Sequence, residues 1–225
     1  MREMDERIKH VLEHTEMIRA PRQELATFGS TTIDYYLITA LAERVNVVRE
    51  GKVIAERPRI VTPAYLVKVE GFSEQARGYI EMMAREHPHD AGVFYRYRNN
   101  PREMNVVSEP IGEVITKLNA RVEEQRNPLS TIIKGVEELW DVSLLVFIFE
   151  LTQRSLHTNV AEFYRGGFLD MDSSGVPKDA RTYIEELFEQ VRKDLSRAPQ
   201  LVVELNRWGL FPEYQDSFFA LFQGR

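Results

Sequence analysis

Apolar residues in the first half of the chain gather in short extended segments rich in β-branched and aromatic residues, a pattern typical of β-strands. The segment "TIDYYLITAL" (32–41) is rich in β-branched and aromatic residues, which favours a strand. The segment "VNVVREGKVIAERPRIVTP" (45–63) contains two extended runs around Glu50–Gly51, and this predicts a β-hairpin. Because Pro58 cannot donate a backbone hydrogen bond, the second run is expected at a sheet edge or at a bulge.

Two helices and a second hairpin complete the pattern expected before residue 110. The apolar positions of the first helix are spaced to form one stripe, and Pro21 ends it; they are Ile8, Val11, Leu12 and Ile18. Ser73 is placed to cap a helix over residues 73–87. The segments 91–98 and 103–109 read as strands on either side of the turn "NNP" (99–101). The first half is therefore expected to hold a hairpin-rich antiparallel sheet.

From Pro110 onward the apolar spacing becomes helical, and we expect no further strand. The predicted helices begin near residues 111, 136, 158 and 180, and two more occupy the tail from residue 199. The fold class expected is α+β, with an N-terminal helix and an antiparallel sheet followed by an all-helical C-terminal half. The lobes would be residues 1–109 and 110–225, joined in one continuous body because no flexible linker separates them.

Composition narrows the classes of protein that remain. The chain has 225 residues, a formal net charge of −6, 43% hydrophobic residues and no cysteine. These values fit a globular protein and exclude disulfides and thiolate metal sites. The charged N-terminal segment differs from a signal peptide. The apolar run Val142–Phe149 is too short to cross a bilayer and is expected to form a buried core helix. We therefore expect a cytoplasmic protein without a membrane partner.

The stretch "DMDSSGVPKDAR" (170–181) begins like a calcium-binding loop. Asp170, Asp172, Ser174 and Gly175 stand where such a loop has its first oxygen ligands and its glycine. Lys178 and Arg181, however, occupy the ninth and twelfth positions, where oxygen ligands are required. A polar bend between two helices is the better interpretation, and no cofactor is predicted from this stretch.

Histidine pairs provide the alternative of a transition-metal site. His87, His89 and Asp90 lie within four residues, and alternate residues of an extended chain project the same way. Further ligands would have to come from elsewhere, for example from Glu86 or His157. A second pair, His10 and His14, lies on one helical face with Glu6 one turn earlier. Polar loops and exposed helix faces also carry histidines without function. The first group, His87–Asp90, supports the alternative function of a metal-dependent or hydrolytic enzyme.

Arginines beside aromatic residues provide a third alternative, a nucleic-acid or anion contact. Alternation along the strand places Arg96 and Arg98 on one face, and Arg57 and Arg59 share a face of the earlier hairpin. The negative net charge and the interspersed acidic residues disfavour nucleic acid as a partner. A solvated strand face is the competing interpretation.

The aromatic tail supplies the leading functional hypothesis. The chain lacks the sequence signatures of nucleotide-binding loops, of serine hydrolases and of helical zinc proteases. Near the C-terminus a cluster of large aromatic residues could pack on the body or dock on a partner; it comprises Trp208, Phe218, Phe219 and Phe222. The sequence therefore favours a protein that acts by binding a protein partner or by self-association, and disfavours an enzyme.

Overall fold

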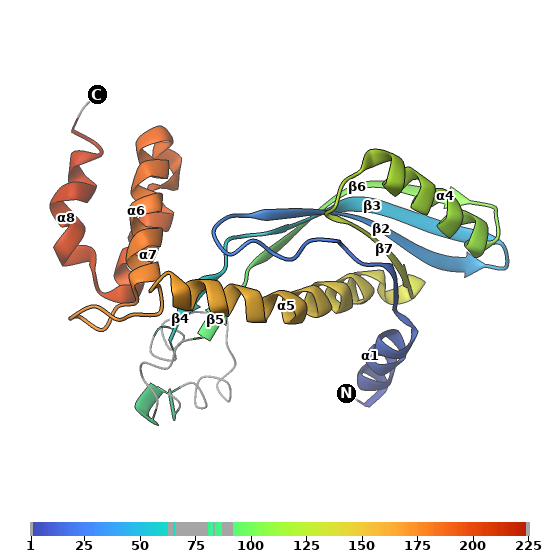
Figure 1. The fold of residues 1–225 in the computed structure, drawn as a ribbon, viewed down its shortest axis with the longest axis horizontal. Helices are drawn as coiled ribbons and strands as arrows, with labels where there is room; N and C mark the ends of the chain where they lie inside the picture. The colour runs from blue at the N-terminus through green and yellow to red at the C-terminus, as the bar shows by residue number, and fades with distance from the viewer. Residues whose placement is uncertain (1, 63–64, 66–80, 83, 87–91, 224–225) are drawn as a thin grey trace. The chain divides into compact units, whose positions relative to one another are not determined.

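The computed structural model of the chain describes residues 2–62, 65, 81–82, 84–86 and 92–223 (Figure 1). It divides into two compact units. Unit 1 comprises Met1–Pro58 and Tyr95–Val160, and unit 2 comprises Arg59–Phe94 and Ala161–Arg225. The chain therefore passes between the units three times, after residues 58, 94 and 160.

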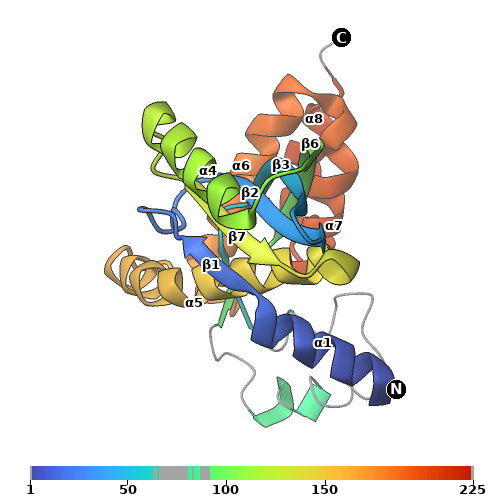
Figure 2. The ribbon, with the colours of Figure 1, turned by 90° about the vertical axis from the view of Figure 1, so that its right-hand side faces the viewer.

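Unit 1 is built around a five-stranded mixed sheet in the order β1-β7-β2-β3-β6. The strands are β1 (Glu16–Arg19), β2 (Thr31–Ala42), β3 (Val45–Ala55), β6 (Tyr97–Val107) and β7 (Ser130–Gly135). The pair β2–β7 is parallel, and the other three pairs are antiparallel. This arrangement leaves β1 and β6 as the two edges of the sheet (Figure 2).

Helices cover both faces of this sheet, as Figure 1 shows. The helix α5 (Trp140–Arg165) lies on one face, where Tyr35 and Leu37 meet Phe147. On the other face, α4 (Ile111–Gln125) packs against Tyr36 and Ile38. Because neighbouring strand residues point to opposite faces, this alternation along β2 gives unit 1 two apolar cores. The helix α1 (Arg2–His14) and the short 3-10 helix η1 (Glu137–Leu139) complete the unit.

Unit 2 is mainly helical. It contains the two-stranded sheet of β4 (Arg59–Val61) and β5 (Gly92–Phe94), and the helices α6 (Lys178–Lys193), η2 (Leu195–Arg197), α7 (Ala198–Trp208) and α8 (Phe211–Ala220). Its core consists of apolar side chains from α6, α7 and α8, including Ile184, Leu187, Val191, Leu201, Leu205 and Phe218. Gly209 ends α7 with a φ of 69°, a left-handed conformation that glycine adopts without strain.

The α+β fold class is confirmed, as are the strand over residues 32–41 and the helices beginning near residues 111 and 180. The expectation of an all-helical second half is wrong at one place, because Ser130–Gly135 forms β7. This strand lies between β1 and β2, pairs in parallel with β2 and is largely buried, so the sheet is not purely antiparallel. Its short apolar run has no clear period, which is expected of a strand buried on both faces.

Both predicted hairpin turns are wrong. Glu50–Gly51 lies within the continuous strand β3, whose hairpin with β2 turns at residues 43–44. Gly51 is present for a packing reason, because the Tyr35 ring lies where a Cβ atom would project. The segment "NNP" likewise lies inside β6, where Pro101 is tolerated at an edge strand beside a register shift.

Three predicted helices differ from the observed elements. The first helix ends at His14 rather than at Pro21, because Glu16–Arg19 pairs with β7 as strand β1. The helices expected from residues 136 and 158 are one continuous helix, α5. Most of the helix predicted from Ser73 lies outside the described residues, although residues 81–82 and 84–86 are helical.

The lobes 1–109 and 110–225 stay a prediction. The two units of the structure take other parts of the chain, since β7 and most of α5 belong to the same unit as β2 and β3. The sheet therefore draws residues from both predicted lobes.

Candidate functional site

A partly buried polar network lies on the α5 side of the unit 1 sheet. Arg49 of β3 donates to both carboxylate oxygens of Glu137 in η1, from Nη2 at 2.6 Å and from Nη1 at 2.8 Å. The Nη1 atom also donates to the Thr39 hydroxyl at 3.0 Å, and that hydroxyl donates to Glu137. The Arg49 guanidinium stands 5.1 Å from the centre of the Trp140 ring. This bidentate pair fixes η1 and the start of α5 on the sheet.

We expect this network to make the stability of unit 1 depend on pH. The hydrogen bonds from Arg49 lower the pKa of Glu137 from its usual value of 4.5. A carboxyl with a lowered folded-state pKa stabilises the fold above its usual pKa, and this contribution is lost as the pH falls through the folded-state value. Glu137→Gln should therefore lower the free energy of unfolding by about 1.5 kcal/mol at pH 7. The difference from the wild type should shrink below pH 4.5.

Trp140 gives a local readout for this test, because unit 1 contains one of the two tryptophans and unit 2 contains the other. Urea unfolding followed by fluorescence in a Trp208→Phe background isolates unit 1. Glu138→Gln is the matched control, since Glu138 is an exposed neighbour of Glu137. Equal losses for the two variants would contradict the role assigned to Glu137.

A solvent-open hollow of about 530 Å³ lies beside this network. His10, His14 and Glu13 of α1 line it on one side, and Glu137 and Glu138 on the other. The two imidazole rings are 4.0 Å apart, and His14 Nδ1 donates to the backbone carbonyl of His10 at 2.8 Å. Within the described ranges, no three His, Asp or Glu side chains are grouped so that they could hold a metal ion. The hollow therefore gives no support to a metal site at the His10 and His14 pair.

The principal histidine candidate cannot be placed. His87, His89 and Asp90 lie outside the described residues. The metal hypothesis for that segment therefore stays a prediction.

The four arginines proposed for nucleic-acid contact do not form one surface. Arg96 is exposed and lies 3.6 Å from a carboxylate oxygen of Glu56, and Arg98 is exposed on β6. Arg57 lies outside any strand, whereas Arg59 belongs to β4 and to unit 2. Only 7% of the Arg59 surface is exposed, which places it in the interior of that unit.

Arg59 is the centre of a buried charged cluster in unit 2. Its Nη1 atom donates to Glu204 Oε1 at 3.0 Å, and the guanidinium stacks 4.4 Å from the centre of the Tyr183 ring. Glu204, 4% exposed, also accepts from Trp208 Nε1 at 3.2 Å and from Arg207 Nη1 at 3.3 Å. Burial opposes the charge of Arg59, but the neighbouring carboxylate outweighs it and raises the pKa of the guanidinium.

This cluster holds the small sheet of unit 2 against α6 and α7. The fully buried Asp179 of α6 accepts the backbone amide of Ile60 at 2.7 Å, next to Arg59 in β4. The space among these side chains has no room for a water-sized molecule. The cluster is therefore closed and has a structural role.

The aromatic residues of the tail divide between the core and the surface of unit 2. Phe218 is buried in the α6–α7–α8 core, and Trp208 is partly buried beside Tyr65. Phe219 and Phe222 are exposed, and both rings contact Phe218. The helix α8 thus packs on its own unit while leaving two large aromatic side chains on the surface.

The calcium-like stretch is a bend tied by its own cations. Arg181 Nε donates to Asp172, and Lys178 Nζ lies 3.0 Å from Asp170 Oδ2. The other oxygen of Asp172 accepts the backbone amides of Ser174 and Val176. Arg181 also pairs with Glu213 of α8 at 2.6 Å. Both aspartates are therefore used inside the unit.

The feature that the sequence did not indicate is an uncovered apolar strip on unit 1. Four large side chains are exposed there: Met104 and Val106 of β6 by 64% and 59%, and Leu145 and Phe149 of α5 by 60% and 63%. Met104 stands opposite Arg49 in the sheet and so points to the α5 face, as Val106 does two residues later. We call these four residues the β6–α5 strip.

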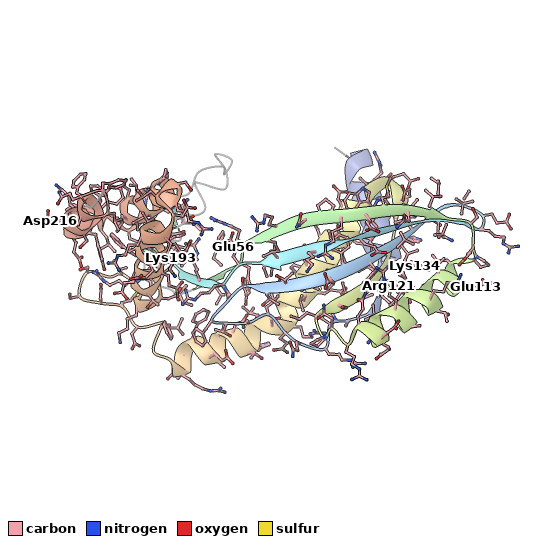
Figure 3. The ribbon with its side chains drawn as sticks, turned by 90° about the horizontal axis from the view of Figure 1, so that it is seen from above. Glu56, Glu113, Arg121, Lys134, Lys193 and Asp216 are labelled. Carbon is pink, nitrogen blue, oxygen red and sulfur yellow. The ribbon has the colours of Figure 1, made fainter. Side chains whose placement is uncertain are left out.

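The two halves of the strip border the same strand. Leu145, Phe149 and Thr152 follow one another at helical spacing on one flank of α5. Thr152 Oγ1 is 2.5 Å from the hydroxyl of Tyr97, the first residue of β6. The flank that carries Thr152 therefore contacts the first residue of β6, at one edge of the sheet that Figure 3 shows from above. Met104 and Val106 lie seven and nine residues further along the same strand. The sequence signal for the exposed residues of α5 was the run "VSLLVFIF". A helix that is apolar on all sides has more apolar residues than a single buried face can cover.

The chain matches no protein-family model, no curated protein and no solved structure. Over the part of the chain that the structure describes, no helix has both the length and the apolar character needed to cross a membrane.

Proposed function

We propose that this protein acts by protein association, binding a protein partner or a second copy of itself through the β6–α5 strip. The exposure of its four apolar side chains is the observation that carries this proposal. Single exposed apolar residues are common on protein surfaces. Here Met104 and Val106 are neighbours on one face of β6, and Leu145 and Phe149 are neighbours on one flank of α5, and neighbouring exposed apolar side chains indicate an interaction site. The strip lies on a sheet and a helix, which present it as a rigid surface.

Other features of the described residues favour association over catalysis. The charged groups that lie close together are engaged in internal pairs, as Arg49 is with Glu137 and Arg59 with Glu204. The closed space beside Arg59 has no room for a small molecule. Phe219 of α8 and Phe222, which follows the helix, form a second pair of exposed apolar side chains, on unit 2.

The proposal is tested by placing a charge in the strip. Phe149→Glu should convert an assembled species to the monomer, or raise the dissociation constant at least tenfold, because a carboxylate would be buried in an apolar contact. Native mass spectrometry and light scattering on the full-length chain measure the assembly state directly. Thr158→Glu, which adds the same charge at an exposed position on the opposite side of α5, is the matched control.

Folding is checked on the same samples. Because Phe149 is largely exposed, its substitution should change the free energy of unfolding by no more than about 0.5 kcal/mol. If the chain is monomeric at about 50 µM and Phe149→Glu behaves like the wild type, self-association is rejected. If, in addition, no candidate protein partner binds the wild type more tightly than the Phe149→Glu variant, the whole proposal is rejected.

A further inference from the structure

The edge strand β6 offers unpaired backbone groups along its outer side. It is 11 residues long, whereas the opposite edge strand β1 has only four. A long open edge is a template for another strand, and proteins usually protect it with proline, charges or bulges. In β6 these protections lie in the first part, where Arg98, Pro101 and a register shift occur. The segment from Met104 to Val107 contains no proline and no charged residue.

The unprotected segment carries half of the β6–α5 strip. Met104 and Val106 point to the α5 face, and Asn105 between them points to the α4 face, where it lines a groove with Val107. All of Glu103 to Val106 is exposed. An added strand would therefore meet both open backbone groups and two apolar side chains.

The geometry points to a second copy of this chain as the occupant, with its β6 pairing antiparallel to the first β6 about a two-fold axis at Asn105. In this register Met104 stands opposite Val106 of the other copy, and Val106 opposite Met104, so both apolar pairs form on one face. A strand from another protein would need two apolar residues at the same spacing. The β6 strand of a second copy already has them, in its own Met104 and Val106. This inference rests on the proposed function and specifies its surface and its partner.

Such pairing would join the two five-stranded sheets into one continuous sheet with the two β6 strands side by side at its centre. Met104 and Val106 of both copies would then be covered by a single symmetric contact.

The absence of native cysteine allows a direct test in the full-length chain. In the Asn105→Cys variant, the two Cα atoms across the axis would be about 4.5–5.5 Å apart, within the range of a disulfide. Mild oxidation should therefore give a covalent dimer in most of the protein. Asn100→Cys is the matched control on the same exposed strand, because the two residues 100 would lie about 34 Å apart in this register.

A mixing experiment tests the register itself. When the Met104→Cys and Val106→Cys proteins are mixed and oxidised, they should give more covalent dimer than either protein gives alone, because residue 104 of one copy lies opposite residue 106 of the other. Val106→Lys, which places a charge on the open edge, should raise the dimer dissociation constant at least tenfold. Circular dichroism and tryptophan fluorescence of each variant establish that it is folded before the oxidation is read.

The outcomes separate this inference from the proposal on which it rests. A dimer by native mass that is sensitive to Phe149→Glu but gives no disulfide at residue 105 would overturn β6 pairing and leave protein association standing. Equal disulfide yields at residues 100 and 105 would show random collision and would also overturn it. A monomer without any disulfide would reject both the pairing and self-association.

Discussion

Replacing Glu204 with alanine is expected to lower the free energy of unfolding of unit 2 by about 3–5 kcal/mol. The change removes the carboxylate that neutralises Arg59, which is 7% exposed and cannot reach solvent without opening the unit. It also leaves the Trp208 indole nitrogen and Arg207 without their shared acceptor. A buried charge that loses its partner costs far more than the net value of the pair.

The measurement is urea unfolding of the Trp140→Phe background, in which Trp208 reports on unit 2 alone. Because the chain has two units, separate transitions are fitted rather than one two-state curve. Glu189→Ala is the control, since Glu189 pairs with Arg192 on the exposed side of α6. Such a surface pair should contribute less than about 1 kcal/mol. A loss below that value for Glu204→Ala would show that the cluster is open to water.

Replacing Gly51 with valine is expected to lower the free energy of unfolding of unit 1 by about 3 kcal/mol, the upper end of the usual overpacking cost. A Cβ atom at residue 51 would stand 2.5 Å from the Tyr35 hydroxyl oxygen and 2.6 Å from the ring carbon that bears it. Tyr35 is buried in the α5-side core, and its hydroxyl donates to Asn99 at 3.1 Å, so the ring has little freedom to move. The strand must bend or the tyrosine must leave its pocket.

Gly112→Ala serves as the comparison for this substitution. Gly112 lies in the first turn of α4, and nothing lies within 4 Å of the position that its Cβ would take. Alanine there should be neutral or should stabilise the helix by up to about 1 kcal/mol. Both variants are measured in the Trp208→Phe background with Trp140 as the reporter. If Gly51→Val and Gly112→Ala had equal effects, the packing of Tyr35 on β3 would not be the reason for glycine at residue 51.

Local patterns predicted the elements whose surroundings are local. β-Branched and aromatic residues indicated the strand at residues 32–41, helical spacing of apolar residues indicated the helix at 178–193, and both are present. The residues 130–135 are different, because this short apolar segment is a strand only through pairing with β1 and β2, far away in the sequence. Gly51 was misread for the same reason, since the tyrosine that explains it lies on another strand.

The candidate sites show the same limit. Arg59 was expected beside Arg57 on an exposed face, because the sequence gives no sign that Glu204 reaches it from 145 residues away. The exposed Leu145 and Phe149 were assigned to the core with the rest of their apolar run, since hydrophobicity alone does not show which side of a helix is covered. The exposed Phe219 and Phe222, in contrast, lie in the aromatic cluster that the tail indicated.

The position of β7 between β1 and β2 has a consequence for how the protein is made. The strands β2, β3 and β6 can pair as they leave the ribosome, but β1 has no neighbour in the sheet until Ser130–Gly135 has been synthesised. The segment β4 likewise waits for α6 and α7, which supply Asp179 and Glu204. In the nascent chain, β1 therefore stays without a pairing strand until β7 has been made, and β4 stays without its buried polar partners until α6 and α7 have been made. A chaperone that binds such segments, or slow synthesis of the second half, would decide how much of the protein reaches this fold.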